Sequence, residues 1–249
     1  MSLAALRQQL AAVVAGTPST TPGLPTGFAA LDAILPGGGI PRGRITELLA
    51  PPGLGKTTIA RALVAATIRS GGGVAWIDAA RTLDPRDWAA GVSVAVDPEA
   101  LWVVRPADPA RAPWCADLLL RSGAFALVVL DGAPVLPRTV AVRLAQLARA
   151  SDAALLLLGD GTRASEIGGA LRVRLALHTA PHATPHTVVA TLEKGGPYQH
   201  VQLEVGRGIG IARRLCTHPE IPDRRGVAGA RQRRRHEPRA LGRAPTRAH

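Results

Sequence analysis

Nine consecutive residues have the types and the spacing that bind phosphate: Ala50, Pro51, Pro52, Gly53, Leu54, Gly55, Lys56, Thr57 and Thr58. The two glycines let main-chain N–H groups turn towards an anion, because they carry no Cβ. Lys56 supplies a positive charge for the β- and γ-phosphates of a nucleotide, and Thr57 supplies a hydroxyl for Mg²⁺. These residues predict a phosphate-binding loop of the Walker A type, with Ala50 in place of its usual first glycine.

Lysine is rare in this chain, which makes its place in the loop informative. The sequence has 30 lysines and arginines together, and Lys56 and Lys194 are its two lysines. An arginine-rich chain that keeps lysine at the phosphate position favours a nucleotide role over an ordinary glycine-rich turn. An apolar strand before the loop and a helix after it point the same way.

A second candidate lies at the end of an apolar run, Ala126-Leu-Val-Val-Leu-Asp131. A carboxylate at the carboxyl end of a buried strand can hold Mg²⁺ through water, as a Walker B strand does. A strand that ends in aspartate also occurs for purely structural reasons, and Asp131 alone does not decide between the two. Together with Lys56 and Thr57 it predicts a site for ATP and Mg²⁺.

Short apolar strands alternate with helices through most of the chain. The predicted strands are 45–49, 74–77, 101–104, 125–130 and 153–158, and the predicted helices are 28–35, 57–70, 112–121 and 137–150. This alternation is typical of βαβ units on a parallel sheet that is buried on both faces. Residues 171–177, 187–192 and 200–205 alternate apolar and polar side chains, and they predict antiparallel strands at one edge of that sheet.

The chain divides into three parts by composition. We predict a helix and a linker over residues 1–22 and an α/β domain over residues 23–206. Residues 207–249 form a basic tail whose sequence lacks periodicity, and we predict that this tail is disordered. The tail holds 12 arginines against three acidic residues, a net charge of +9 out of +12 for the whole chain.

Such an arm predicts binding to nucleic acid or to an acidic partner; the alternative is a tail that reflects a compositionally biased genome. The candidate DNA contacts are Arg213, Arg214, Arg224, Arg225, Arg231, Arg233, Arg234 and Arg235.

Other features exclude several classes of protein. Cys115 and Cys216 lie far apart and form neither a disulfide framework nor a metal-spaced cluster, which suits a reducing cytosol. The longest apolar runs, 124–130 and 153–158, are too short to cross a bilayer. We therefore expect a soluble, cytoplasmic protein that does not enter a membrane.

Several further segments resemble the RecA family of recombinases. They are residues 26–32 (Thr-Gly-Phe-Ala-Ala-Leu-Asp), 37–44 (Gly-Gly-Gly-Ile-Pro-Arg-Gly-Arg), 76–79 (Trp-Ile-Asp-Ala), 83–85, 121–124 and 168–175. The resemblance covers residues 23–205 and implies a RecA-like P-loop core, mainly parallel with antiparallel strands at its C-terminal edge. Within the family the chain resembles most the ImuA-type accessory proteins of damage-induced mutagenesis, through residues 24–28 and 35–43.

The chain departs from true recombinases at positions that matter for hydrolysis. In RecA a glutamate that polarises the attacking water follows Ile-Asp-Ala, and here that residue is Ala80. Asp160 stands where RecA has a sensing glutamine, and the two mobile DNA-binding loops are shortened. Lys194 matches one of two lysines that reach the ATP of a neighbouring subunit, so the resemblance adds it to the ATP site.

The resemblance implies an ATP-binding accessory protein of DNA repair, acting in translesion synthesis during the SOS response to DNA damage, with weak or no hydrolysis. No catalytic residue is predicted firmly, although Asp78 and Asp84 are possible substitutes for the missing glutamate. The implied partners are RecA, the Y-family polymerase homologue ImuB, an error-prone DnaE-type polymerase, single-stranded DNA and further copies of the chain. Two alternatives remain: an active DNA-dependent ATPase or recombinase, and a nucleotide-independent interaction protein of the SulA type.

Overall fold

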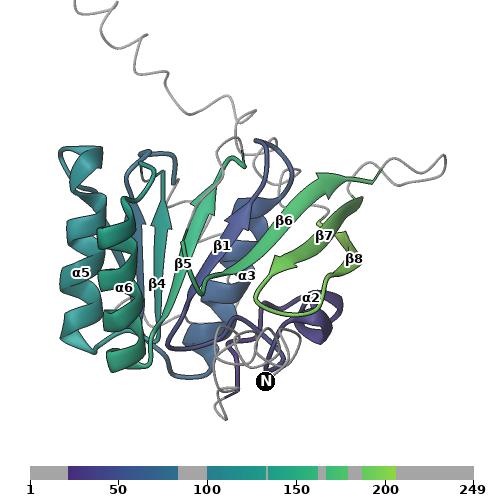
Figure 1. Ribbon diagram of the computed structural model, residues 1–249, viewed down its shortest axis with the longest axis horizontal. Coiled ribbons are helices and arrows are strands. Elements are labelled where there is room, and N and C mark those ends of the chain that lie inside the picture. Colours follow the sequence, from purple (N-terminus) through teal and green to yellow (C-terminus); the bar gives the residue numbers. More distant parts are fainter. Residues whose placement is uncertain (1–21, 84–99, 133, 162–166, 179–186, 206–249) are drawn as a thin grey trace, which may run out of the picture. The chain divides into compact units, whose positions relative to one another are not determined.

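The computed structural model describes residues 22–83, 100–132, 134–161, 167–178 and 187–205. Their strands form one eight-stranded sheet in the order β3-β2-β4-β5-β1-β6-β7-β8 (Figure 1). The strands are β1 (Ile45–Leu49), β2 (Val74–Asp78), β3 (Leu101–Val104), β4 (Leu127–Asp131), β5 (Ala154–Gly159), β6 (Leu171–Leu177), β7 (Thr187–Lys194) and β8 (Gln199–Glu204). The helices are α2 (Ala29–Ile34), α3 (Lys56–Arg69), α5 (Ala112–Ser122) and α6 (Arg138–Ser151), with a 3₁₀ turn at Pro109–Arg111.

The sheet is parallel from β3 through β6, and the last two strand pairings, β6 with β7 and β7 with β8, are antiparallel. The α/β architecture with an antiparallel edge is therefore confirmed. Because β1, β4 and β5 run in the same direction, their carboxyl ends meet at one edge of the sheet. A crevice at that edge is where open α/β sheets bind ligands.

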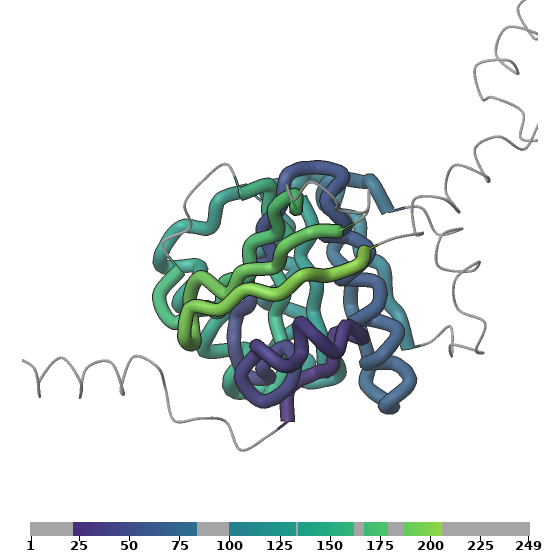
Figure 2. Tube along the Cα trace, turned by 90° about the vertical axis from the view of Figure 1, so that its right-hand side faces the viewer, coloured from purple at the N-terminus to yellow at the C-terminus, as the bar shows by residue number. Residues whose placement is uncertain are grey.

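Helices cover the two faces of the sheet unequally. Helices α5 and α6 pack on one face of β2, β4, β5 and β1, and α3 packs on the opposite face (Figure 1). The antiparallel edge lies beside the N-terminal segment that contains α2, and α2 contacts β8 (Figure 2).

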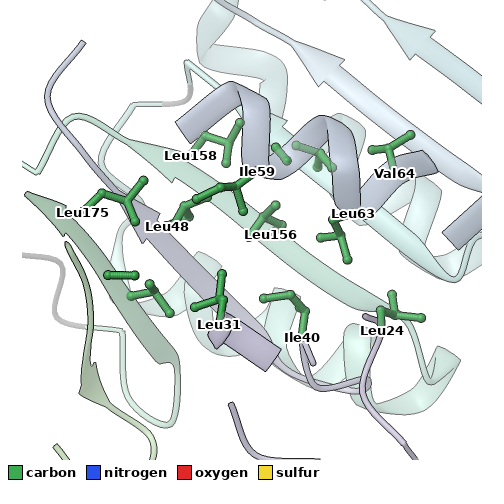
Figure 3. Close-up of a cluster of buried hydrophobic side chains, with 14 of the residues drawn as sticks. Leu24, Leu31, Ile40, Leu48, Ile59, Leu63, Val64, Leu156, Leu158 and Leu175 are labelled. Carbon is green, nitrogen blue, oxygen red and sulfur yellow. The ribbon is translucent and has the colours of Figure 1, made fainter. Parts of the chain in front are cut away.

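The core under α3 explains why this helix starts and runs where it does. Ile59, Leu63 and Val64 recur at helical spacing, and all three are buried against the sheet. They meet Leu48 of β1 and Leu156 of β5, which point to the same face (Figure 3). Packing against the strands thus sets the position of α3, and α3 in turn sets the position of the loop that precedes it.

The elements agree with the sequence prediction apart from shifts at their ends. Strand β4 begins at Leu127, and Phe125, which lies before the strand, has its ring edge-on to Trp102. Helix α3 begins at Lys56, one residue before the predicted start, because Gly55 has a left-handed conformation that ends the loop. The predicted N-terminal helix and the basic tail lie outside the described residues. Among the residues that the structure describes, no helix is both long and apolar enough to span a membrane.

Candidate functional site

Lys56 of the predicted phosphate loop, the end of β4 and the end of β5 line one cavity of about 490 Å³. Strand pairing aligns the ends of β1, β4 and β5, because Leu49 is opposite Gly159 and Asp131 is opposite Leu158. The residues lining the cavity include Lys56, Ala80, Asp131, Gly159 and Asp160. Residues more than 100 positions apart in sequence thus share one wall.

The loop has the backbone that an anion site requires. Gly53 and Gly55 have φ angles of +84° and +79°, which disfavour any residue with a Cβ. Gly55 is the N-cap of α3, so the first N–H groups of the helix face the loop. A Cβ on Gly55 would also lie 2.1 Å from Cγ1 of Val205. The end of β8 is therefore packed against the loop, a contact that the sequence pattern does not reveal.

The ammonium group of Lys56 points at the end of β5. Its Nζ donates to the carbonyl oxygen of Gly159 at 2.9 Å, and the same oxygen accepts the N–H of Ala50 at 3.1 Å. Ala50 is fully buried in the core beneath α3, which accounts for a methyl group where the motif usually has glycine. Thr57 lies one residue further along α3 and is exposed, so its hydroxyl is open to a ligand.

Asp131 lies at the end of β4 in the electrostatic field of Lys56. Burial raises the pKa of its carboxyl group above the ordinary value. The positive charge of Lys56 and a hydrogen bond from the Gly132 amide lower that pKa, whereas the negative charge of Asp78 raises it. A cation beside Asp131 would act in the same direction as Lys56, which is the electrostatic behaviour expected of a residue that supports Mg²⁺.

Ala80 also lines this cavity. It is exposed, and it packs so closely on Gly132 that a Cβ added there would lie 2.5 Å from its methyl carbon. The turn after β2 and the turn after β4 are therefore in contact. A side chain longer than methyl at position 80 would extend into the cavity that Lys56 and Asp131 also line.

Asp78 has a structural role in that turn. Its carboxylate is fully buried and accepts hydrogen bonds from the N–H groups of Thr82 and Leu83 and from Nε of Arg105, at 3.0, 3.3 and 2.9 Å. Both carboxylate oxygens are thus engaged, which argues against the prediction that Asp78 replaces the missing base. Asp84, the other predicted substitute, lies outside the described residues.

Lys194 lies at the end of β7, next to the start of β6, because it pairs with Arg172. Its Nζ donates to the carbonyl oxygen of Ile167 at 2.7 Å. Ile167 lines the cavity, whereas Lys194 itself does not. The eight arginines predicted to contact DNA all lie outside the described residues.

One ion pair in the cavity floor was not predicted. Glu47 of β1 is buried, and its Oε2 accepts from Nε and a terminal nitrogen of Arg172 at 3.0 and 2.9 Å. A glutamate in the middle of a buried strand is a signal that it has a partner, because an unpaired buried carboxylate is costly. The sequence does not say which arginine the partner is.

Comparisons with known proteins identify the family. The family model "RecA N-terminal domain" matches residues 8–146. Protein RecA of Nocardioides sp. is 47% identical over 116 residues, which cover 46% of this chain and 32% of that protein. Protein RecA of Kineococcus radiotolerans is 44% identical over 113 residues, covering 45% and 32%. The chain thus matches about a third of the length of these relatives.

A solved structure extends the likeness of fold. The crystal structure of the RadB recombinase superposes with a TM-score of 0.57 at 23% identity, and the match covers 73% of this chain and 95% of that one. It therefore includes more of this chain than the sequence match does. The phosphate loop, the aspartate at the end of β4 and the family match over more than half of the chain lead to one conclusion: the protein belongs to the RecA family.

Proposed function

We propose that this protein binds ATP with Mg²⁺ and hydrolyses it slowly or not at all, as an accessory factor in DNA repair. The observation that carries the proposal is that Lys56 and Asp131 line one cavity at the sheet edge and interact electrostatically, beside a left-handed Gly55 at the start of α3. In this site the N–H groups of α3 and Lys56 would hold the phosphates, while Thr57 and Asp131 would hold the metal. Mg²⁺, when bound, would neutralise phosphate charge.

The proposal of slow or absent hydrolysis depends on the residues that could act as a general base in the cavity. Hydrolysis requires a group that orients or deprotonates water, and the wall residue Ala80 offers a methyl group. The carboxylate of Asp78 is already bonded to the turn after β2. A protein that binds ATP without cleaving it would use the nucleotide as a ligand that stabilises one conformation of the protein.

The resemblance to ImuA-type proteins supports a narrower role in translesion synthesis. It suggests RecA, ImuB and a DnaE-type polymerase as partners, together with single-stranded DNA. In this role the ATP-bound form is the one that engages its partners.

Calorimetric titration with ATP and Mg²⁺ tests the nucleotide site. Replacing Lys56 with alanine removes a charge-assisted contact worth about 1.5–3 kcal/mol, so affinity should fall by roughly 10- to 150-fold. Arg69→Ala is the matched control, because it removes the same charge from the far end of the same helix, roughly 20 Å away. Equal affinity in Lys56→Ala and the wild type would refute the site.

A second candidate function is a DNA-dependent ATPase or recombinase, favoured by the 47% identity to a RecA protein over 116 residues. It requires turnover that single-stranded DNA stimulates. A SulA-type role without nucleotide predicts no ATP binding at all, and the complete Gly55-Lys56-Thr57 sequence speaks against it.

A further inference from the structure

The last described strand ends against the phosphate loop. Val205, the residue after β8, is buried in the core beneath α3. A Cβ built on Gly55 would lie 2.1 Å from Cγ1 of Val205 and 3.3 Å from its Cγ2, so this side chain packs closely on the loop. Because Gly55 is the N-cap of α3, the chain leaves the described domain beside the N–H groups that would receive a phosphate.

The residues that follow Val205 bring an arginine close to the same loop. The sequence continues Gly206-Arg207-Gly208. A chain advances by at most about 3.6 Å per residue, so the Cα atom of Arg207 lies within about 7 Å of the Cα atom of Val205. Arg207 is not one of the eight arginines predicted to contact DNA, which begin at Arg213. Its distance from the loop therefore separates it from the other arginines of the tail.

The described lining of the cavity has fewer positive than negative charges. Among the described residues that line it, Lys56 is the only cation, whereas Glu47, Asp131 and Asp160 bring three carboxylates. A triphosphate adds further negative charges, which Mg²⁺ offsets only in part. A second cation that can reach the phosphates would therefore favour nucleotide binding.

The two arginines of β6 that reach the lining are held by carboxylates. Arg172 pairs with Glu47 at 2.9 Å. Arg174 pairs with Glu193 and donates to the carbonyl oxygen of Gly161. Neither arginine could turn to a phosphate without leaving its carboxylate unpaired. The second cation must therefore come from another part of the chain.

We infer that Arg207 is the second cation of the nucleotide site and that its guanidinium group binds the phosphates of ATP. The inference rests on the proposed function and adds a residue to the same site. A guanidinium group presents its N–H donors in one plane and can pair with two phosphate oxygens at once, whereas the ammonium group of Lys56 acts as a point charge. Val205 sets the place from which the segment starts, and Gly206 allows the main chain to turn there.

Calorimetric titration of the full-length chain with ATP and Mg²⁺ tests this contact. In Arg207→Gln the affinity should fall by roughly 10-fold or more, as is typical when a hydrogen bond between charged groups is lost. Arg207→Lys keeps the charge and should retain part of the affinity. The matched control, Arg213→Gln, removes the same charge further along the tail and should stay within about twofold of the wild type, because salt screens exposed charges. The loss in Arg207→Gln should also shrink as the salt concentration rises.

Equal affinity in Arg207→Gln and the wild type would overturn the inference. Equal losses in Arg207→Gln and Arg213→Gln would overturn it too, because they would show that net charge acts rather than one residue. Lys56→Ala is titrated in the same series, so ATP binding that depends on Lys56 but not on Arg207 leaves the proposed function standing. A wild type that binds no ATP refutes the proposed function, and the role of Arg207 with it.

Discussion

The carboxyl group of Asp131 lies between charges that act on it in opposite directions. Burial and the charge of Asp78 raise its pKa, and Lys56 and a hydrogen bond from Gly132 lower it, with a net increase. The folded state therefore keeps the proton of Asp131 to a higher pH than the unfolded state, in which an aspartate has a pKa of about 3.9. Stability should fall as the pH rises from that value through the raised pKa.

The prediction for Asp131→Asn follows from this sign. Without nucleotide the variant should be more stable than the wild type at neutral pH, and it should lose the part of the pH dependence that Asp131 supplies. Urea unfolding between pH 4 and pH 8 measures both effects, and equal affinity for the metal-free nucleotide is the control for an intact site. A variant that unfolds at lower urea concentrations than the wild type at neutral pH would contradict the assigned pKa shift.

At the scale of the elements, the ion pair between Glu47 and Arg172 ties β1 to β6 beneath the cavity. Removing one partner leaves a buried charge without compensation, which typically costs about 3–5 kcal/mol. Arg172→Met should therefore lower the free energy of unfolding by about that amount. The double variant Glu47→Leu/Arg172→Met should recover most of it, because the buried charge is gone.

A neighbouring arginine on the same strand supplies the control. Arg174 pairs with Glu193 at the surface, where such pairs contribute about 0–1 kcal/mol. Arg174→Met should thus change stability little. Equal losses from Arg172→Met and Arg174→Met would show that burial does not distinguish the two pairs.

The sequence predicted the helices and strands more completely than it predicted the contacts between them. Alternating apolar strands and helices predicted the order and type of the described strands and helices, because each apolar run must be buried on a sheet of this kind. The phosphate loop was predictable because its chemistry depends on consecutive residues. The contact of Val205 with Gly55 and the bond from Lys56 to Gly159 were not, since they join residues more than 100 positions apart.

At the scale of the whole molecule, charge is concentrated at one end of the sequence. Residues 207–249 carry a net charge of +9, whereas the remaining 206 residues carry +3. If these arginines neutralise phosphates, affinity for DNA depends on salt in proportion to the number of contacts, with a slope of about −0.7 per contact for single strands. The predicted tail would then supply most of the affinity for DNA.

Deletion of residues 207–249 should therefore weaken binding to single-stranded DNA and flatten its dependence on salt. Fluorescence anisotropy with a labelled oligonucleotide at several salt concentrations measures both quantities. As a control, the eight predicted contact arginines are replaced with glutamine in the full-length chain. This variant shows whether the charge of the tail or its length determines binding. Unchanged affinity and slope in the truncated protein would assign DNA binding to residues 1–206.

The central claim is that the site holds ATP without cleaving it, and the fate of bound ATP tests this most directly. Wild type and Ala80→Glu are incubated with radiolabelled ATP and Mg²⁺, separated rapidly from free nucleotide, and assayed for bound ATP and ADP over time. We predict that the wild type retains ATP, and that Ala80→Glu converts it faster, because general-base catalysis is worth about 10²–10⁴ in rate. Ala80→Gln, which has the same length and no basic oxygen, should resemble the wild type. Rapid conversion to ADP by the wild type, kept in Ala80→Gly, would contradict the account.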